Sequence, residues 1–166
     1  FLKLTKIQTH YNSIRVNLVK FFLFLLFLQL IIGAFVSGMD AGKIYNTWPL
    51  MGSSYFPDDS KIFEFLSIHI FNNPSIVQFI HRNLAYLLII VYLFVLFSVL
   101  IERHKKLLKP IIIIGFILLL QIGLGVLTIL SGVKIIYASL HQINSILIVL
   151  STLYFIYINQ DKKIIN

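Results

Sequence analysis

The chain alternates between long apolar stretches and short polar connections. Four nearly continuous apolar runs cover residues 16–36, 78–100, 110–130 and 137–158. Each run is close to the roughly 20 residues that a helix needs to cross the hydrocarbon core of a bilayer. None shows the strict apolar and polar alternation of a barrel strand. The pattern therefore predicts an all-α membrane protein, folded as an antiparallel bundle of four transmembrane helices.

The same pattern divides the chain into three parts. Residues 1–15 are predicted to be a cytoplasmic juxtamembrane segment, 16–158 the transmembrane domain, and 159–166 a cytoplasmic tail. Within the domain, the connection 39–77 is too long for a simple turn, which is typical of a functional loop or lid. Its apolar segment 61–71 is too short to span a bilayer, so we expect it to lie at the interface over the bundle mouth or to form a partner surface.

The first apolar run shares some features with a signal peptide. Basic residues precede it, and it ends in the small residues Gly33, Ser37 and Gly38. It is longer than the apolar region of a signal peptide, so we expect a retained helix. The chain begins with Phe1 rather than Met, and we therefore treat it as a candidate fragment of a longer protein.

Composition and charge agree with a membrane protein. Hydrophobic residues make up 58% of the chain and charged residues 12%, far from the average soluble domain. The net charge of +8 could indicate nucleic-acid binding, but the basic residues lie at the edges of the apolar runs. By the positive-inside rule, both termini and the middle connection are predicted to be cytoplasmic. The basic residues that carry this prediction are Lys3, Lys6, Arg15, Lys20, Arg103, Lys105, Lys106, Lys109, Lys162 and Lys163.

Two histidines lie inside different apolar runs at a similar depth. His81 is three residues after Gln78, and His141 is four residues after Tyr137. These steps correspond to about 4.5 and 6 Å along a helix. An imidazole in hydrocarbon is costly and is usually functional. Because the second and fourth helices of such a bundle lie across a diagonal, the two side chains are candidates to bind a haem iron from both sides.

Small residues near both histidines are compatible with a flat macrocycle. Ala85, Ala138 and Ser145 lie on the faces of the two histidines. Small residues also simply allow helices to pack closely. Each histidine, taken alone, could instead bond to a backbone carbonyl, relay protons or line a polar cavity.

Other site chemistry finds no support in the sequence. Without a cysteine, neither a disulfide nor a thiolate ligand can form within the chain. There is no phosphate-binding glycine loop, HExxH motif or plausible serine triad. Three further histidines are expected in solvated or lipid-facing positions: His10, His69 and His104.

Several segments, in order and spacing, resemble the carboxy-terminal half of haem A synthase. They are GAFVSGMDAGKIYNTWPLMG at 33–52, Pro57, VQFIHRNLAY at 77–86, QIGLGVLTIL at 121–130 and ASLHQ at 138–142. The resemblance covers residues 33 to about 150. It implies an eight-helix protein of the cell inner membrane, built from two similar four-helix halves, of which this chain is the second.

The resemblance also implies an activity. Haem A synthase is an oxidoreductase that converts the C8 methyl of haem O to a formyl group. Its amino-terminal half carries the substrate haem and a glutamate in an ExxHR pattern, and its carboxy-terminal half holds a haem b cofactor. Here Gln78 takes the place of that glutamate, which fits a cofactor site because an amide cannot act as a carboxylate base. The implied partners are membrane lipid, the amino-terminal half, haem O and haem O synthase, with no catalytic residue in this half.

Carried over to this chain, the resemblance makes His81 and His141 the axial ligands of the haem b iron. Arg82 becomes a candidate partner for a haem propionate, with an interfacial anchor as the alternative. Two neutral imidazoles favour six-coordinate, low-spin iron that transfers electrons. Three residues of the DAG-YNT stretch are expected to shape the outer mouth: Asp40, Tyr45 and Asn46.

Two other functions remain open from the sequence. The chain could be a small b-type membrane cytochrome that carries electrons alone, or an inactive fragment or scaffold. An upstream four-helix block with an ExxHR motif would favour the synthase.

Overall fold

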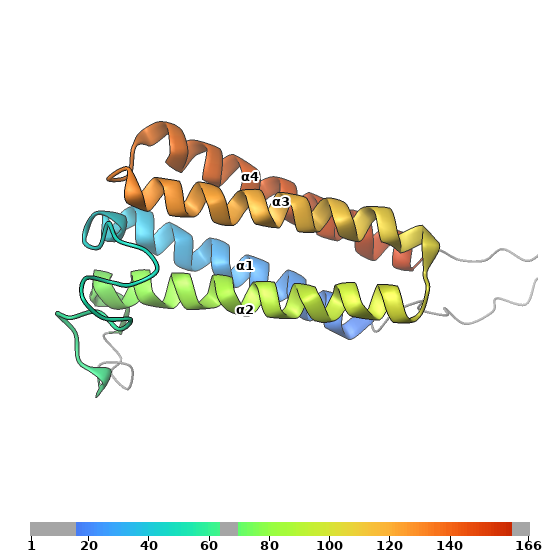
Figure 1. The fold of residues 1–166 in the computed structure, drawn as a ribbon, viewed down its shortest axis with the longest axis horizontal. Helices are drawn as coiled ribbons and strands as arrows, with labels where there is room; N and C mark the ends of the chain where they lie inside the picture. Colours follow the sequence, from blue (N-terminus) through green and yellow to red (C-terminus); the bar gives the residue numbers. More distant parts are fainter. Residues whose placement is uncertain (1–15, 64–69, 161–166) are drawn as a thin grey trace, which may run out of the picture.

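The computed structural model describes residues 16–63 and 70–160, and these residues form four long helices (Figure 1). The helices are α1 Val16–Gly38, α2 Pro74–Ile101, α3 Lys105–Leu130 and α4 Ile135–Asn159. Two short 3-10 turns, η1 Ala41–Lys43 and η3 Ile70–Asn72, lie in the connection between α1 and α2. All four long helices are long and apolar enough to cross a membrane. The predicted all-α membrane fold is confirmed.

Three helices begin earlier than their apolar runs. The side chain of Asn73 caps α2 by accepting hydrogen bonds from the backbone N–H groups of Ser75 and Ile76, and Pro74 occupies the first turn. Similarly, α3 begins at Lys105 and α4 at Ile135. The long connection therefore ends at residue 73, not 77. Hydropathy marks the part of a helix that lies in the bilayer, so it misses capped or polar first turns.

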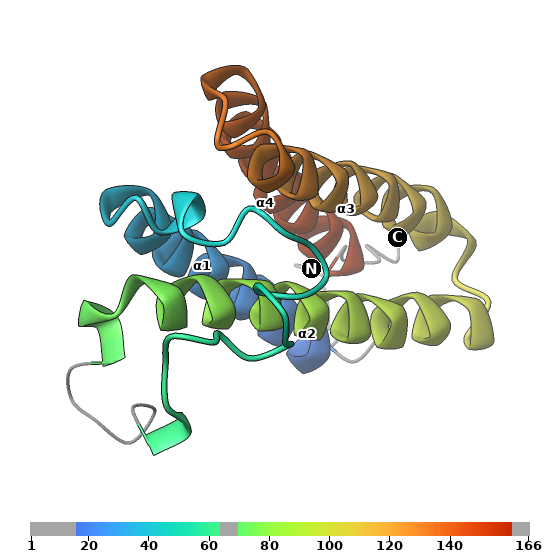
Figure 2. The ribbon, with the colours of Figure 1, turned by 60° about the vertical axis from the view of Figure 1, so that its left-hand side comes forward.

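The four helices form two hairpins. Helix α1 packs mainly against α2 and α3 mainly against α4, with smaller interfaces between α1 and α4 and between α2 and α3. This order places α2 and α4 on a diagonal of the bundle. The two hairpins lie as two layers that diverge toward the end with the long connection (Figure 2).

In α3 and α4 the buried core lies toward the opposite end of the bundle. In α3 the last buried residue is Leu118, and in α4 the first is Asn144. No residue from 119 to 143 is buried. The main core side chains are Val19, Phe22, Leu25, Leu26, Leu88, Val91, Val95, Val99, Leu107, Ile111, Ile114, Ile148 and Phe155. The core therefore extends along α1 and α2 to Ile32, Val77 and Leu84, near the long connection, but includes only one half of α3 and α4.

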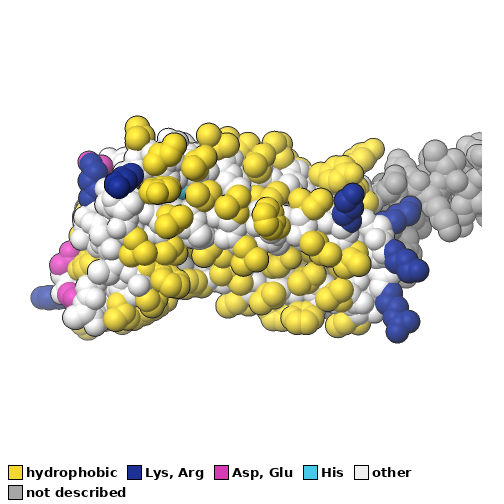
Figure 3. All heavy atoms as spheres, turned by 45° about the horizontal axis from the view of Figure 1, so that its top comes forward, with side chains coloured by type: hydrophobic (Ala, Val, Ile, Leu, Met, Phe, Trp, Pro, Cys, Tyr) yellow, Lys and Arg dark blue, Asp and Glu magenta, His cyan; other side chains and the backbone are white. Residues whose placement is uncertain are grey.

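The surface has an apolar middle and charged ends (Figure 3). Within the described residues, Lys20, Arg103, Lys105, Lys106 and Lys109 belong to the end that contains the α2–α3 connection. The acidic residues Asp40, Asp58 and Asp59 lie in the long connection at the other end. Part of the charge prediction lies outside the described residues, together with the two terminal segments: Lys3, Lys6, Arg15, Lys162 and Lys163.

A candidate paired-histidine site

His81 of α2 contacts two residues that are one turn apart on α1. The side-chain nitrogen of Gln29 lies 3.2 Å from His81 Nε2 and also donates a hydrogen bond to the His81 carbonyl at 3.1 Å. The ring lies against Gly33, where an added Cβ would be 3.2 Å from His81 Cε1. Any residue larger than glycine at position 33 would press on the imidazole.

His141 of α4 makes the corresponding contacts with α3. The side-chain nitrogen of Gln121 lies 3.2 Å from His141 Nε2, and the Gln121 carbonyl lies 3.1 Å from His141 Nδ1. An added Cβ on Gly125 would be 3.0 Å from His141 Cε1. These contacts assign the proton to Nδ1, which donates to the carbonyl, and leave the Nε2 lone pair to accept from the amide.

The two hairpins therefore repeat one local arrangement. In both, a Gln-x-x-x-Gly segment on the first helix contacts a histidine on the second. The small residue Ser145 was predicted to lie near His141, but the contacts of Gln29 and Gln121 with the histidines were not predicted. A signal was present, because a polar amide within an apolar span is costly and here recurs with the same spacing to a glycine.

The two rings lie at matching positions along their helices. His81 is seven residues after Pro74, and His141 is six residues after Ile135. These steps correspond to about 10.5 and 9 Å from the helix starts, somewhat deeper than the apolar runs predicted. The two residues are 60 positions apart in the sequence and lie at a similar level on helices that occupy a diagonal of the bundle.

Several buried polar atoms near His81 have no hydrogen-bond partner among the described residues. They are Gln29 Oε1, Gln78 Oε1, His81 Nδ1 and Arg82 Nε. Unpaired polar atoms are costly away from water, and most buried polar groups in proteins are paired. Their gathering on α1 and α2 marks this region as a candidate binding site rather than ordinary helix packing.

Arg82 lies beneath the long connection. Its side chain is 7% exposed. The guanidinium donates hydrogen bonds to the carbonyls of Tyr45, at 3.1 Å, and Leu50, at 3.3 Å. The Gln78 amide donates to the same Tyr45 carbonyl at 3.1 Å. Arg82 and Gln78 thus attach residues 45–50 to the outer end of α2.

Two carboxylates accept hydrogen bonds from the rest of the connection. The first is that of Asp58. It accepts hydrogen bonds from the Ser53 backbone N–H at 2.9 Å, the Ser53 hydroxyl at 3.0 Å and the Ser54 hydroxyl at 2.7 Å. These bonds, the Ser53 backbone bond foremost, lower the pKa of Asp58. Gly52 approaches this carboxylate closely with a φ of 79°, a conformation that favours glycine.

Asp59 joins the connection to the start of α2. It accepts a hydrogen bond from the Ser75 hydroxyl at 2.7 Å and one from the Ser60 hydroxyl at 3.0 Å. Partial burial acts to raise the pKa of Asp59, but hydrogen bonds from Ser75, Ser60 and Tyr45 outweigh it, so the pKa is lowered. The hydrogen bonds that hold this part of the loop therefore favour the charged form of the Asp59 carboxylate.

Two further predicted residues, Asn46 and Asp40, lie at the end of the bundle with the long connection. Asn46 donates to the Gly42 and Ile129 carbonyls, each at 3.0 Å, and so links the connection to the end of α3. Asp40 instead forms an exposed ion pair with Lys43 at 2.8 Å. At the other end, His104 contacts Glu102 at 2.9 Å. His10 and His69 lie outside the described residues, as does most of the predicted interfacial segment 61–71.

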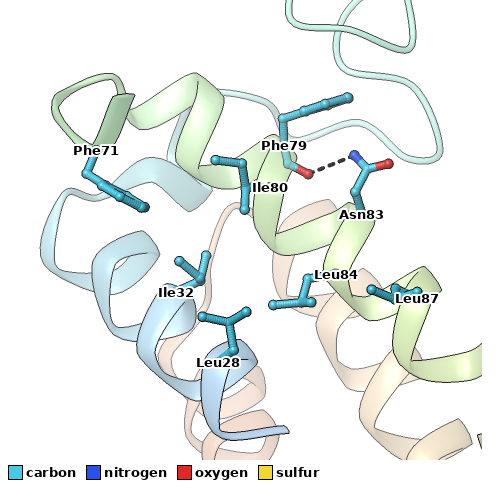
Figure 4. Close-up of a pocket in the computed structure, with 8 residues that line it drawn as sticks. All are labelled: Leu28, Ile32, Phe71, Phe79, Ile80, Asn83, Leu84 and Leu87. Carbon is cyan, nitrogen blue, oxygen red and sulfur yellow. Dashed lines mark hydrogen bonds between the residues drawn. The ribbon is translucent and has the colours of Figure 1, made fainter. Parts of the chain in front are cut away.

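An apolar groove of about 400 Å³ lies between α1 and α2 (Figure 4). Neither His81 nor His141 lines it, so it is separate from the histidine site. Its lining residues are Leu28, Ile32, Phe71, Phe79, Ile80, Asn83, Leu84 and Leu87.

The fold and the site define a class: a multi-pass helical membrane protein with two histidines at one level of the bundle. Comparison with known proteins identifies the family. The chain belongs to the COX15-CtaA family, described as cytochrome oxidase assembly protein, whose model matches residues 6–153. The resemblance found in the sequence is confirmed.

Proteins named heme A synthase are among the relatives. That of Pelagibacter ubique (strain HTCC1062) is 40% identical over 160 residues, which cover 96% of this chain and 47% of the relative. That of Rickettsia bellii (strain RML369-C) is 40% identical over 124 residues, covering 75% and 37%. That of Wolbachia pipientis wMel is 41% identical over 134 residues, covering 81% and 37%. The chain thus spans less than half the length of these relatives, and no solved structure matches it significantly.

Proposed function

We propose that this chain is the cofactor-binding half of a haem A synthase, in which His81 and His141 are the axial ligands of one haem b. The observation that carries the proposal is the pair of imidazoles at matching depth on diagonal helices, each placed by the same Gln and Gly contacts. The names of the relatives and the share of their length that matches support a role as one half of that enzyme.

The residues present fit a haem. The donor set is two imidazoles, which suits haem iron. His81 Nδ1 is a buried polar atom with no partner among the described residues, and each ring rests on a glycine where a Cβ would intrude. The core ends before this level in α3 and α4. When bound, a haem with two imidazole ligands supplies one-electron transfer.

The chain's other residues have supporting roles in this proposal. Arg82 retains a buried Nε–H with no partner among the described residues, which makes it the candidate to pair with a haem propionate. Its other bonds attach residues 45–50 over the outer end of α2, so the connection covers that end of the site. No residue of this half is assigned a catalytic role. Gln78 uses its amide to bond the loop, consistent with a cofactor site.

The rest of the reaction is placed in the other half of the enzyme. That half would bind haem O, delivered from haem O synthase, and oxidise its C8 methyl to the formyl group of haem A. The protein would lie in the cell inner membrane, with both ends of this segment on the cytoplasmic side. A stand-alone b-type cytochrome uses the same histidines without the biosynthetic chemistry, and it is distinguished by the absence of a second half.

Haem content of purified variants tests the ligand assignment. The chain is purified in detergent, and haem is measured by a reduced-minus-oxidised optical spectrum for the wild type, His81→Ala and His141→Ala. We expect each substitution to remove most of the bound haem. His104→Ala is the control, since His104 lies at the far end of the bundle beside Glu102 and should leave haem content unchanged. Wild-type haem content in both His81→Ala and His141→Ala would contradict the proposal.

A further inference from the structure

The two histidines differ in what holds the ring. Both Nε2 atoms lie 3.2 Å from a glutamine side-chain nitrogen. At His141, Nδ1 also has an acceptor, the backbone carbonyl of Gln121 at 3.1 Å. At His81, Nδ1 is buried and has no partner among the described residues. One ring is therefore fixed at both nitrogens and the other at only one.

The glutamines themselves are also held differently. Asn144, three residues after His141, donates to Gln121 Oε1 at 2.7 Å and to the Ile117 carbonyl at 3.0 Å. The corresponding position after His81 is Leu84, which cannot donate. The side chain of Gln29 is held instead through its bond to the His81 carbonyl, and its Oε1 has no partner among the described residues.

These contacts bear on the protonation pattern of each neutral ring. A neutral imidazole carries one proton, and an iron ligand must offer the bare nitrogen. At His141 the backbone carbonyl keeps the proton on Nδ1, whatever side chain residue 121 carries. At His81 only the Gln29 amide, which donates to Nε2, favours a proton on Nδ1. Without that amide, no described contact distinguishes the two tautomers.

We propose that Gln29 is a positioning residue that keeps His81 Nε2 unprotonated and available to iron, a task that the Gln121 backbone performs for His141. The proposal rests on the proposed function, because it assumes that both rings bind haem. The lone pair of His81 Nε2 that accepts the hydrogen bond from the Gln29 amide is the one that iron would take. The amide therefore keeps Nε2 unprotonated until iron replaces the amide.

The test compares the same substitution at three glutamines: Gln29→Met, Gln121→Met and Gln142→Met. Gln142 is an exposed residue next to His141 and is the matched control. Nitrogen chemical shifts of ¹⁵N-histidine-labelled protein, measured by solid-state NMR before haem is added, report the tautomers. Haem titration then gives affinity, and circular dichroism verifies that each variant retains its helices.

We expect Gln29→Met to give a mixture of tautomers at His81 and to weaken haem binding only by the fraction of His81 that keeps Nε2 bare, about two-fold for an equal mixture. Gln121→Met should leave His141 protonated at Nδ1, and Gln142→Met should change neither readout. Unchanged tautomers in Gln29→Met, or an equal loss of tautomer selection in Gln121→Met, would overturn the proposal. If His81→Ala and His141→Ala leave haem content unaltered, the proposed function itself fails, whatever the NMR shifts of the glutamine variants.

Discussion

At the scale of single residues, the site depends on two glycines that have no side chain to displace the histidine rings. Gly33 and Gly125 let an imidazole lie directly on the neighbouring helix backbone. At Gly125 the space left for a Cβ is tighter than ordinary van der Waals contact, with His141 Cε1 at 3.0 Å. The orientation of each ring is thus set by a glycine on one helix as much as by the histidine on the other.

Substitution of Gly125 by valine should displace the His141 ring. Overpacking of this kind typically costs about 1–3 kcal/mol, and here the ring is the group that must move. We expect Gly125→Val to lose most bound haem, measured by pyridine haemochromogen assay. Gly123→Val is the control on the same helix, because a Cβ at Gly123 meets nothing within 4 Å. Equal haem content in the two variants would show that contact with Gly125 does not position the ring.

Part of this candidate site could be predicted from single residues of the sequence. An ionisable side chain in an apolar run stands out, so His81 and His141 could be identified. The hydrogen-bond acceptors of Arg82 could not be predicted, because they are the backbone carbonyls of Tyr45 and Leu50, which every residue type has. The roles of Gln29 and Gln121 depend on which helix faces which, and that is a property of the packed bundle.

At the scale of elements, hydrogen bonds fix the described part of the connection between α1 and α2, residues 39–63 and 70–73. Asp58 gathers Ser53 and Ser54, and Asp59 joins Ser60 to Ser75 at the start of α2. The length of this connection indicated a functional loop. Its internal bonds were not predictable, since most of them join residues through geometry that no local pattern specifies.

The connection should loosen in acid. The pKa values of Asp58 and Asp59 are both lowered in the folded protein, so these carboxylates stabilise the loop above the ordinary carboxyl pKa of 3.8. That contribution falls as the pH drops below this value through the folded pKa values. Trp48, the sole tryptophan of the chain, lies in this connection and reports it by fluorescence. We expect a constant emission maximum from pH 7 to about 5 and a shift at lower pH.

Asp58→Asn is the matched variant for this titration, since the amide keeps the shape and removes the charge. It should show part of the loop change already at pH 7. An emission maximum that is the same in Asp58→Asn and wild type across the whole range would show that the carboxylate does not order the connection.

At the scale of the whole molecule, charge and packing divide the bundle into two ends. The basic residues and the buried parts of α3 and α4 lie toward the α2–α3 connection, and the histidines and the acidic loop lie toward the other end. The apolar runs predicted four helices and their order correctly, because burial in a bilayer requires about 20 apolar residues whatever the tertiary contacts. The diagonal placement of α2 and α4 followed from the prediction of an antiparallel bundle, whereas the divergence of the two hairpins had no sequence signal.

The orientation in the membrane can be measured directly. The chain has no native cysteine, so single cysteines can be labelled without background. By the positive-inside rule, Lys134→Cys in the α3–α4 turn should react with an impermeant maleimide in spheroplasts. Lys105→Cys, at the start of α3, should react only after the membrane is permeabilised. The reverse pattern would contradict the predicted topology.

The central claim, that His81 and His141 hold one haem between them, is tested most directly by the spin state and stoichiometry of the bound iron. Electron paramagnetic resonance of the oxidised, purified chain should give a low-spin signal typical of two imidazole ligands, with about one haem per chain. A predominantly high-spin signal in the wild-type chain, or a low-spin signal that persists in both His81→Ala and His141→Ala, would contradict the account.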